Sequence, residues 1–129
     1  MSREKIREFA DAVDARGAEH RDVDTAVAAG YPDLVAPSTF AVLIAQRSEF
    51  AVLIAPEVGV ELSKVIHAEE RFIHHRPIVA GDVIETVIHI ESMVPRSAIL
   101  MVTTRAELTD AAGAPVSTAF SILAVREYS

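Results

Sequence analysis

The segment from Phe40 to Ala55 constrains the fold of this chain most, because apolar side chains lie on nearly every side of it when it forms a helix. The preceding residues, Gly30-Tyr-Pro-Asp-Leu-Val-Ala-Pro-Ser-Thr-Phe40, are typical of a loop that leads into a helix. Pro37 suits the first turn, and Ser38 or Thr39 can cap the N-terminus. A helix that is apolar all round is expected to be buried, so we expect it to lie at the centre of the domain.

Four later segments predict β-strands, and they are Lys64 to Arg76, Val83 to Val94, Ile99 to Leu108 and Val116 to Val125. Apolar and polar residues alternate in the last three, and in the final one the alternation places Val116, Phe120, Ile122 and Ala124 on one side. Pro and Gly in Arg76-Pro-Ile-Val-Ala-Gly-Asp82, and Gly in Asp110-Ala-Ala-Gly113, indicate chain reversals between strands. Long antiparallel strands wrapped around one buried helix form an α+β hotdog fold.

The first thirty residues are expected to pack against this core. Ser2 to Val13 predicts an amphipathic helix, Asp14 to Asp24 a loop, and Thr25 to Ala29 a short helix that Gly30 ends. No linker or second composition regime divides the chain, so residues 1–129 are expected to form a single domain.

Composition excludes several classes of function. The chain has no cysteine and no basic, apolar leader, which favours a cytoplasmic location and excludes thiol nucleophiles. The net charge of −7 argues against a nucleic-acid partner. Its longest uninterrupted apolar runs are far shorter than the roughly 20 residues that a membrane span requires, so we expect no membrane span.

The Gly30 to Phe40 and Arg76 to Asp82 segments, the opening Ser-Arg-Glu-Lys-Ile-Arg-Glu-Phe-Ala, and Thr109-Asp-Ala-Ala-Gly113 together resemble a known family. The chain resembles the MaoC-like hotdog hydratases and dehydratases, specifically the actinobacterial UPF0336-like (3R)-hydroxyacyl-ACP dehydratase subunits of the A and C type. The resemblance implies a (3R)-hydroxyacyl or 2-enoyl thioester, on ACP or CoA, as the ligand. It also implies an edge-to-edge homodimer, or a heterodimer with a catalytic hotdog subunit, and no cofactor.

Active members of this family resemble one another in a loop that reads Gly-Asp-x-Asn-Pro-x-His-x-Asp. The matching stretch here runs from Asp14 to Asp22. The resemblance places His20 at the catalytic histidine, whereas Ala15 occupies the position of the catalytic aspartate, and Asp14 lies one residue away. Hydration of an enoyl thioester requires one group for the water and another for the α-proton. The matching positions therefore predict an incomplete catalytic pair.

The remaining candidate residues belong to thioester binding. Backbone N–H groups near Ser38 and Thr39 open the central helix and can stabilise an oxyanion, although the sequence favours capping over ligand binding for the Thr39 side chain. Tyr31, Phe40 and Phe72 are candidates for an acyl pocket or for ordinary core packing.

Other interpretations stay open on the sequence alone. One is an active (3R)-specific enoyl hydratase that uses His20 and Asp14, and another is a non-enzymatic hotdog binding or stabilising partner. A hotdog thioesterase would require a carboxylate aimed at the N-terminus of the central helix, and Glu49 lies about three turns along it. His67, His74, His75 and His89 lack the spacing of a metal site, because neighbouring strand residues point to opposite faces, so we expect no metal.

Overall fold

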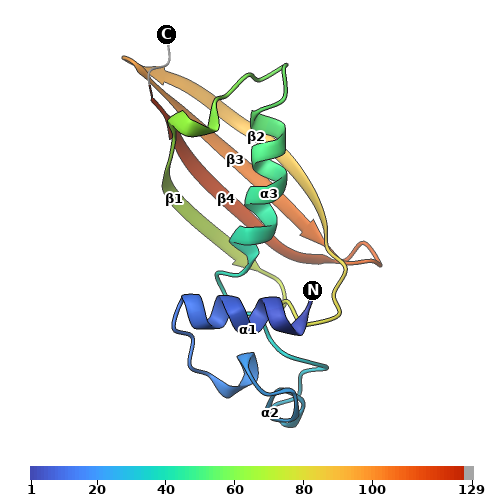
Figure 1. Cartoon of the computed structure of the whole chain (residues 1–129). Coiled ribbons are helices and arrows are strands. Elements are labelled where there is room, and N and C mark those ends of the chain that lie inside the picture. The colour runs from blue at the N-terminus through green and yellow to red at the C-terminus, as the bar shows by residue number, and fades with distance from the viewer. Residues whose placement is uncertain (127–129) are drawn as a thin grey trace.

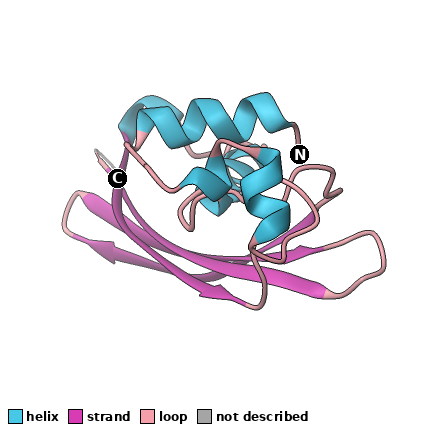
Figure 2. Cartoon of the chain, turned by 90° about the horizontal axis from the view of Figure 1, so that it is seen from below, coloured by secondary structure: helices cyan, strands magenta, loops and turns pink. Residues whose placement is uncertain are grey.

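The computed structural model describes residues 1–126 as an antiparallel sheet with helices on one of its faces (Figures 1 and 2). The strands are β1 (Val65–His74), β2 (Glu85–Arg96), β3 (Ile99–Thr109) and β4 (Pro115–Val125). Their order across the sheet is β1-β4-β3-β2, with every neighbouring pair antiparallel. The four expected strands and the α+β hotdog fold are confirmed.

The helices are α1 (Arg3–Ala12), α2 (Val23–Ala28) and α3 (Ala41–Leu53), with 3-10 turns η1 (Ala18–His20) and η2 (Leu62–Lys64). Ser2 caps α1, since its Oγ accepts a hydrogen bond from the backbone N–H of Lys5. In the described part of the chain, no helix is long and apolar enough to cross a bilayer.

The N-terminus of α3 differs from the prediction. Phe40 is the N-cap residue, and no side chain caps the helix, so the assignment of Ser38 or Thr39 as the cap is wrong. The backbone makes the turn instead: the N–H of Phe40 donates to Pro37 O at 2.9 Å, and that of Val42 donates to Thr39 O at 3.0 Å. These tight bonds satisfy backbone groups that a side-chain cap would otherwise serve.

The burial of α3 is also narrower than expected. Its buried residues recur every fourth position, at Ala41, Ala45, Glu49 and Leu53, and this stripe lies against the sheet. Leu43 and Ile54 remain 43% and 52% exposed on the other sides. A single sheet covers only one side of a helix, so the complete burial predicted from the sequence is not found in one chain.

The core has two apolar parts with a polar layer between them. One part contains Phe40 and Ala45, and the other contains Leu53 farther along α3. Glu49, Thr104 and Ser121 are each 1% exposed and lie on α3, β3 and β4 between those parts. The polar layer therefore crosses the interior at mid-helix.

The residues of β4 that face the core do not coincide with the apolar set that the sequence alternation places on one side of this strand. Core residues of β3 pair with odd-numbered residues of β4, as Ala106 with Ala119 and Val102 with Leu123. Of the apolar set that contains Phe120, Val116 is buried in the core, whereas Phe120, Ile122 and Ala124 are only partly buried. Arg71 of β1 lies over the Phe120 ring at 4.3 Å from its centroid. Serines thus occupy inward positions on β4, which creates the polar layer.

Candidate functional site

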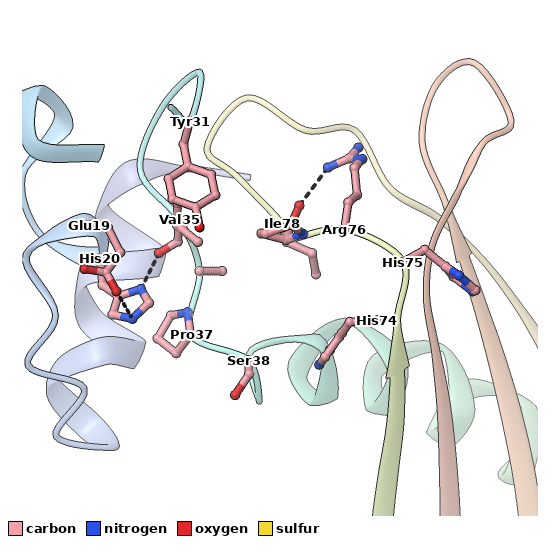
Figure 3. Close-up of a pocket in the computed structure, with 12 residues that line it drawn as sticks. Glu19, His20, Tyr31, Val35, Pro37, Ser38, His74, His75, Arg76 and Ile78 are labelled. Carbon is pink, nitrogen blue, oxygen red and sulfur yellow. Dashed lines mark hydrogen bonds and ion pairs between the residues drawn. The ribbon is translucent and has the colours of Figure 1, made fainter. Parts of the chain in front are cut away.

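A cavity of about 490 Å3 lies where the loop before α3 meets η1 and the end of β1 (Figure 3). Two backbone links hold its walls together: Ala36 N–H donates to Ile78 O at 2.7 Å, and Ala80 N–H donates to Leu34 O at 2.9 Å. These bonds join the two sequence segments that most strongly indicated the fold. The cavity is therefore built from the segments before α3 and after β1.

His20 has a fixed ring orientation at this cavity. Its Nδ1 lies 2.7 Å from Val35 O, and because a carbonyl only accepts, Nδ1 must carry the proton of that bond. The Nε2 of neutral His20 is then a free acceptor, and it lies 3.4 Å from Glu19 Oε1. The His20 side chain is 16% exposed. The geometry thus presents one basic nitrogen with a carboxylate beside it.

Four other predicted site residues occupy different surroundings. The exposed Asp14 carboxylate forms an ion pair with Arg16 at 3.1 Å, and no described contact joins it to His20. Phe40 is 1% exposed, makes an edge-to-face contact with Phe9, and lines a second cavity of about 380 Å3. Thr39 and Phe72 line neither cavity.

Ser38 and Tyr31, by contrast, line the first cavity together with His20. Pro37 and Ser38 lie between His20 and His74 in the view of Figure 3. Of the predicted residues, the cavity therefore gathers His20, Ser38 and Tyr31. Their roles in binding or catalysis stay predictions.

Glu19 and His74 are among the residues that line this cavity and that sequence reasoning did not assign to a site. The His74 ring stacks on Phe72 with centroids 5.3 Å apart, and its Nδ1 lies 2.9 Å from the Oγ of the buried Ser117. The sequence pattern alone gives His74 no role in this cavity. The register that places it opposite Ser117 becomes visible only when β1 is paired with β4.

Glu49, the residue considered for a thioesterase, faces the sheet and not the cavity. Its Oε2 accepts from Ser121 Oγ at 3.2 Å, and Oε1 has no hydrogen-bond partner. Burial, with the neighbouring Glu70 carboxylate, raises the pKa of the Glu49 carboxyl. Among residues 1–126 there is no group of three or more His, Cys, Asp or Glu side chains arranged to hold a metal ion.

Comparisons with known proteins agree with this architecture. A family model described as "FAS1-like, dehydratase domain region" matches residues 1–119. A UPF0336 protein from Saccharopolyspora erythraea is 47% identical over 126 residues, which cover 98% of this chain and 81% of that protein.

Solved structures show the same fold. The HadBC (3R-hydroxyacyl-ACP dehydratase) complex from Mycobacterium tuberculosis contains a chain that matches with a TM-score of 0.85 and 31% identity, over 95% of this chain and 86% of that one. The R-hydratase PhaJ1 from Pseudomonas aeruginosa, at 16% identity and a TM-score of 0.70 over 98% of this chain and 76% of that one, shares the fold. On the family match, the sequence relatives and the fold, this chain belongs to the MaoC-like hotdog hydratases and dehydratases, among the UPF0336 proteins.

Proposed function

We propose that this chain is a subunit of a (3R)-hydroxyacyl-thioester dehydratase or hydratase, and that it binds the acyl thioester, on ACP or CoA, in the cavity beside His20. The observation that carries the proposal is the fixed His20 ring, whose Nε2 is free to accept a proton in a cavity lined also by Ser38. A general base must present such an atom within reach of the reacting water. The HadBC structure, a (3R)-hydroxyacyl-ACP dehydratase, supports the substrate class.

The start of α3 fits the thioester end of the ligand. Ser38 lies at the cavity, two residues before the N-cap of α3, and Pro37 has no N–H to donate. The thioester oxygen, which gains negative charge as water adds to the β-carbon, would lie near the backbone at Ser38 and be stabilised there. The acyl chain would extend from this point past Tyr31.

A second hotdog subunit completes the proposed assembly. Strand β1 is an edge of the sheet, with β4 as its only neighbour among the described strands, and it exposes Ile66 and Ile73. An unpaired edge with apolar side chains is a surface on which another strand can pair. Because His74 at the end of β1 lines the cavity, a partner on this edge would lie close to the bound thioester. The HadBC and ChsH1-ChsH2 complexes are both structural neighbours of this chain and support a hotdog partner, which can be a second copy or a different subunit.

Titration calorimetry with crotonyl-CoA and a long-chain enoyl-CoA tests the proposal, with the oligomeric state measured in the same sample by light scattering. We expect binding to a dimer, weakened at least about tenfold by His20→Ala because the ring forms part of the cavity wall. His89→Ala is the matched control, since His89 is exposed on β2 and does not line the cavity. A folded protein that binds neither thioester would overturn the proposal and favour a non-enzymatic stabilising partner.

A further inference from the structure

Within the loop that resembles the family's catalytic loop, this chain has a carboxylate beside the histidine at an unexpected position. The family's aspartate position is Ala15, which cannot exchange a proton. Glu19, adjacent to His20 in the sequence, places Oε1 3.4 Å from His20 Nε2, and both residues line the cavity. Figure 3 draws this contact as a dashed line and shows both side chains on the same wall.

The backbone of η1 fixes the direction of this pair. The N–H of Val35 donates to Glu19 O at 3.0 Å, while Val35 O accepts from His20 Nδ1 at 2.7 Å. One residue of the loop before α3 therefore holds both the main chain of Glu19 and the ring of His20. The carboxylate and the free nitrogen are left on the same side.

Gly17 provides a second observation about the same carboxylate. A Cβ placed on Gly17 would lie 2.5 Å from Glu19 Oε1 and 2.7 Å from Oε2, far inside van der Waals contact. The backbone at Gly17 has φ −58° and ψ 133°, which any residue adopts without strain. Glycine therefore leaves the space that the Glu19 carboxylate occupies, and any other residue here would displace the flexible end of the Glu19 side chain. Where the motif that this loop resembles has an aspartate and an asparagine, this chain has Ala15 and Gly17.

We infer that Glu19 supplies the carboxylate of the active site in place of the residue missing at Ala15, and that the Glu19–His20 pair makes this chain catalytically competent. The inference rests on the proposed function, because it assigns a residue to the same thioester site. It also departs from the prediction of an incomplete pair.

The Glu19–His20 pair alone can carry the proton transfers of the proposed hydration step. A water molecule donates one hydrogen bond to Glu19 and the other to His20 Nε2, which holds its oxygen toward the β-carbon of the enoyl thioester. As the oxygen–β-carbon bond forms, the water proton passes to Nε2 and the electron pair of the C=C bond moves to the α-carbon and the thioester carbonyl. The imidazolium, stabilised by the Glu19 carboxylate, then returns that proton to the α-carbon, so both groups end as they began. The reverse sequence eliminates water from the (3R)-hydroxyacyl thioester.

The test is steady-state hydration of crotonyl-CoA by the full chain, measured for the wild type and for Glu19→Gln. Glutamine keeps the size of the side chain and removes its charge, so we expect kcat to fall by about 100-fold with KM changed less than about threefold. Glu8→Gln is the matched control, because Glu8 is exposed on α1 and lies outside the cavity, and it should retain wild-type kinetics. Equal kcat for Glu19→Gln and the wild type would overturn the inference.

The variant Gly17→Ala tests whether the position of the Glu19 carboxylate matters, in addition to its presence. This variant keeps Glu19 and an allowed backbone, but its Cβ displaces the flexible end of the Glu19 side chain. We expect thermal stability close to that of the wild type and a fall in kcat comparable to that of Glu19→Gln. Full activity in Gly17→Ala would show that the location of the carboxylate has no role and would overturn the inference.

Binding and hydration by the wild-type chain also test the inference. A wild-type chain that binds enoyl-CoA but produces no hydration would overturn the assignment of Glu19 and leave the proposed binding function standing. A chain that does not bind the thioester would overturn both. The calorimetric and kinetic measurements therefore distinguish failure of this inference from failure of the proposed function.

Discussion

Replacing Glu49 with glutamine is expected to stabilise the protein, and to do so more strongly as the pH rises. Ser121 Oγ lies within hydrogen-bond distance of both Glu49 Oε2 and Glu70 Oε2, yet a hydroxyl donates only one proton. One buried oxygen on each carboxyl, Oε1 in both cases, has no partner at all. His67 Nε2 and Glu70 Oε2, both on β1, lie 2.8 Å apart. Thr104 of β3 is the remaining polar side chain that acts on Glu49. The interior therefore holds two acids with too few donors.

The direction of the pH effect follows from the raised pKa of Glu49, which burial causes first and the Glu70 carboxylate second. In the unfolded chain this carboxyl titrates near its ordinary value of 4.5, so the folded state retains a proton that the unfolded state has already released. The contribution of the protonated Glu49 is thus fully present below that value and is lost as pH rises through the folded-state pKa. Glutamine accepts the Ser121 hydrogen bond and does not ionise, so its advantage grows over the same interval.

The magnitude follows from the oxygen that lacks a donor. A buried polar group without a partner costs about 1–3 kcal/mol, so the free energy of unfolding of Glu49→Gln should exceed that of the wild type by about that amount near pH 8. For a chain of this length, each kcal/mol raises the thermal midpoint by about 3–5 °C. Near pH 4, where the wild-type carboxyl is protonated, the two proteins should differ by less than about 0.5 kcal/mol.

Urea unfolding followed by circular dichroism at several pH values measures this difference. Glu57→Gln is the control, since Glu57 is exposed in the loop after α3 and the same loss of charge there should change little. A Glu49→Gln protein less stable than the wild type near pH 8, or a difference that does not vary with pH, would refute the reasoning. The first result would show that the ionised carboxylate is satisfied in the folded protein.

Three further substitutions test how the core and the turn after β1 are held. Arg76→Lys should lower the free energy of unfolding in urea by about 1–2 kcal/mol, because lysine cannot keep both bonds of the Arg76–Asp82 fork, at 2.8 and 3.1 Å; an unchanged value would contradict this. Gly81→Ala should cost a similar amount in thermal unfolding, about 1–2 kcal/mol, since Gly81 has φ +92° and an added Cβ meets no neighbour, so any loss comes from the backbone. Phe40→Leu should lower the free energy of unfolding in urea by about 1–2 kcal/mol, because it opens a gap against Phe9. A smaller loss for Phe40→Leu than for Phe9→Leu, at the less buried residue, would contradict this packing.

The main elements of the fold could be predicted from the sequence because local patterns specify them. The alternation in β3 places Leu100 and Val102 in the core, as expected, and Gly113 has the positive φ that its hairpin requires. The inward face of β4 could not be predicted in the same way, because apolar residues lie on both sides of the strand, with Leu123 in the core and Phe120 on the outer side. Pairing with β3 decides which side of β4 faces α3, and this long-range register overrides the local preference.

The candidate site was only partly accessible from the sequence. His20 was identified from a loop motif, and the motif drew attention to the aspartate position and its neighbour Asp14. The structure turns Asp14 outward at φ +55° and brings in Glu19. The sequence does contain a signal for this exchange, namely a glycine two residues before the glutamate and a histidine immediately after it. That signal acquires meaning only once the clash between a Cβ at Gly17 and the Glu19 carboxylate can be measured.

The pattern of α3 favours a hotdog partner more directly than the exposed sheet edge does. A helix that served one sheet would need only the buried stripe through Ala45 and Leu53, and the rest of its surface would be polar. Instead, Leu43 and Ile54 are exposed on the sides that the sheet does not cover, while Ile66 and Ile73 are exposed on β1. Within one chain, Ile44 and Phe50 also pack against the core, but these exposed apolar side chains stay uncovered. The assembly of two subunits that we propose would remove them from water and so account for the apolar character of Phe40 to Ala55 on its remaining sides.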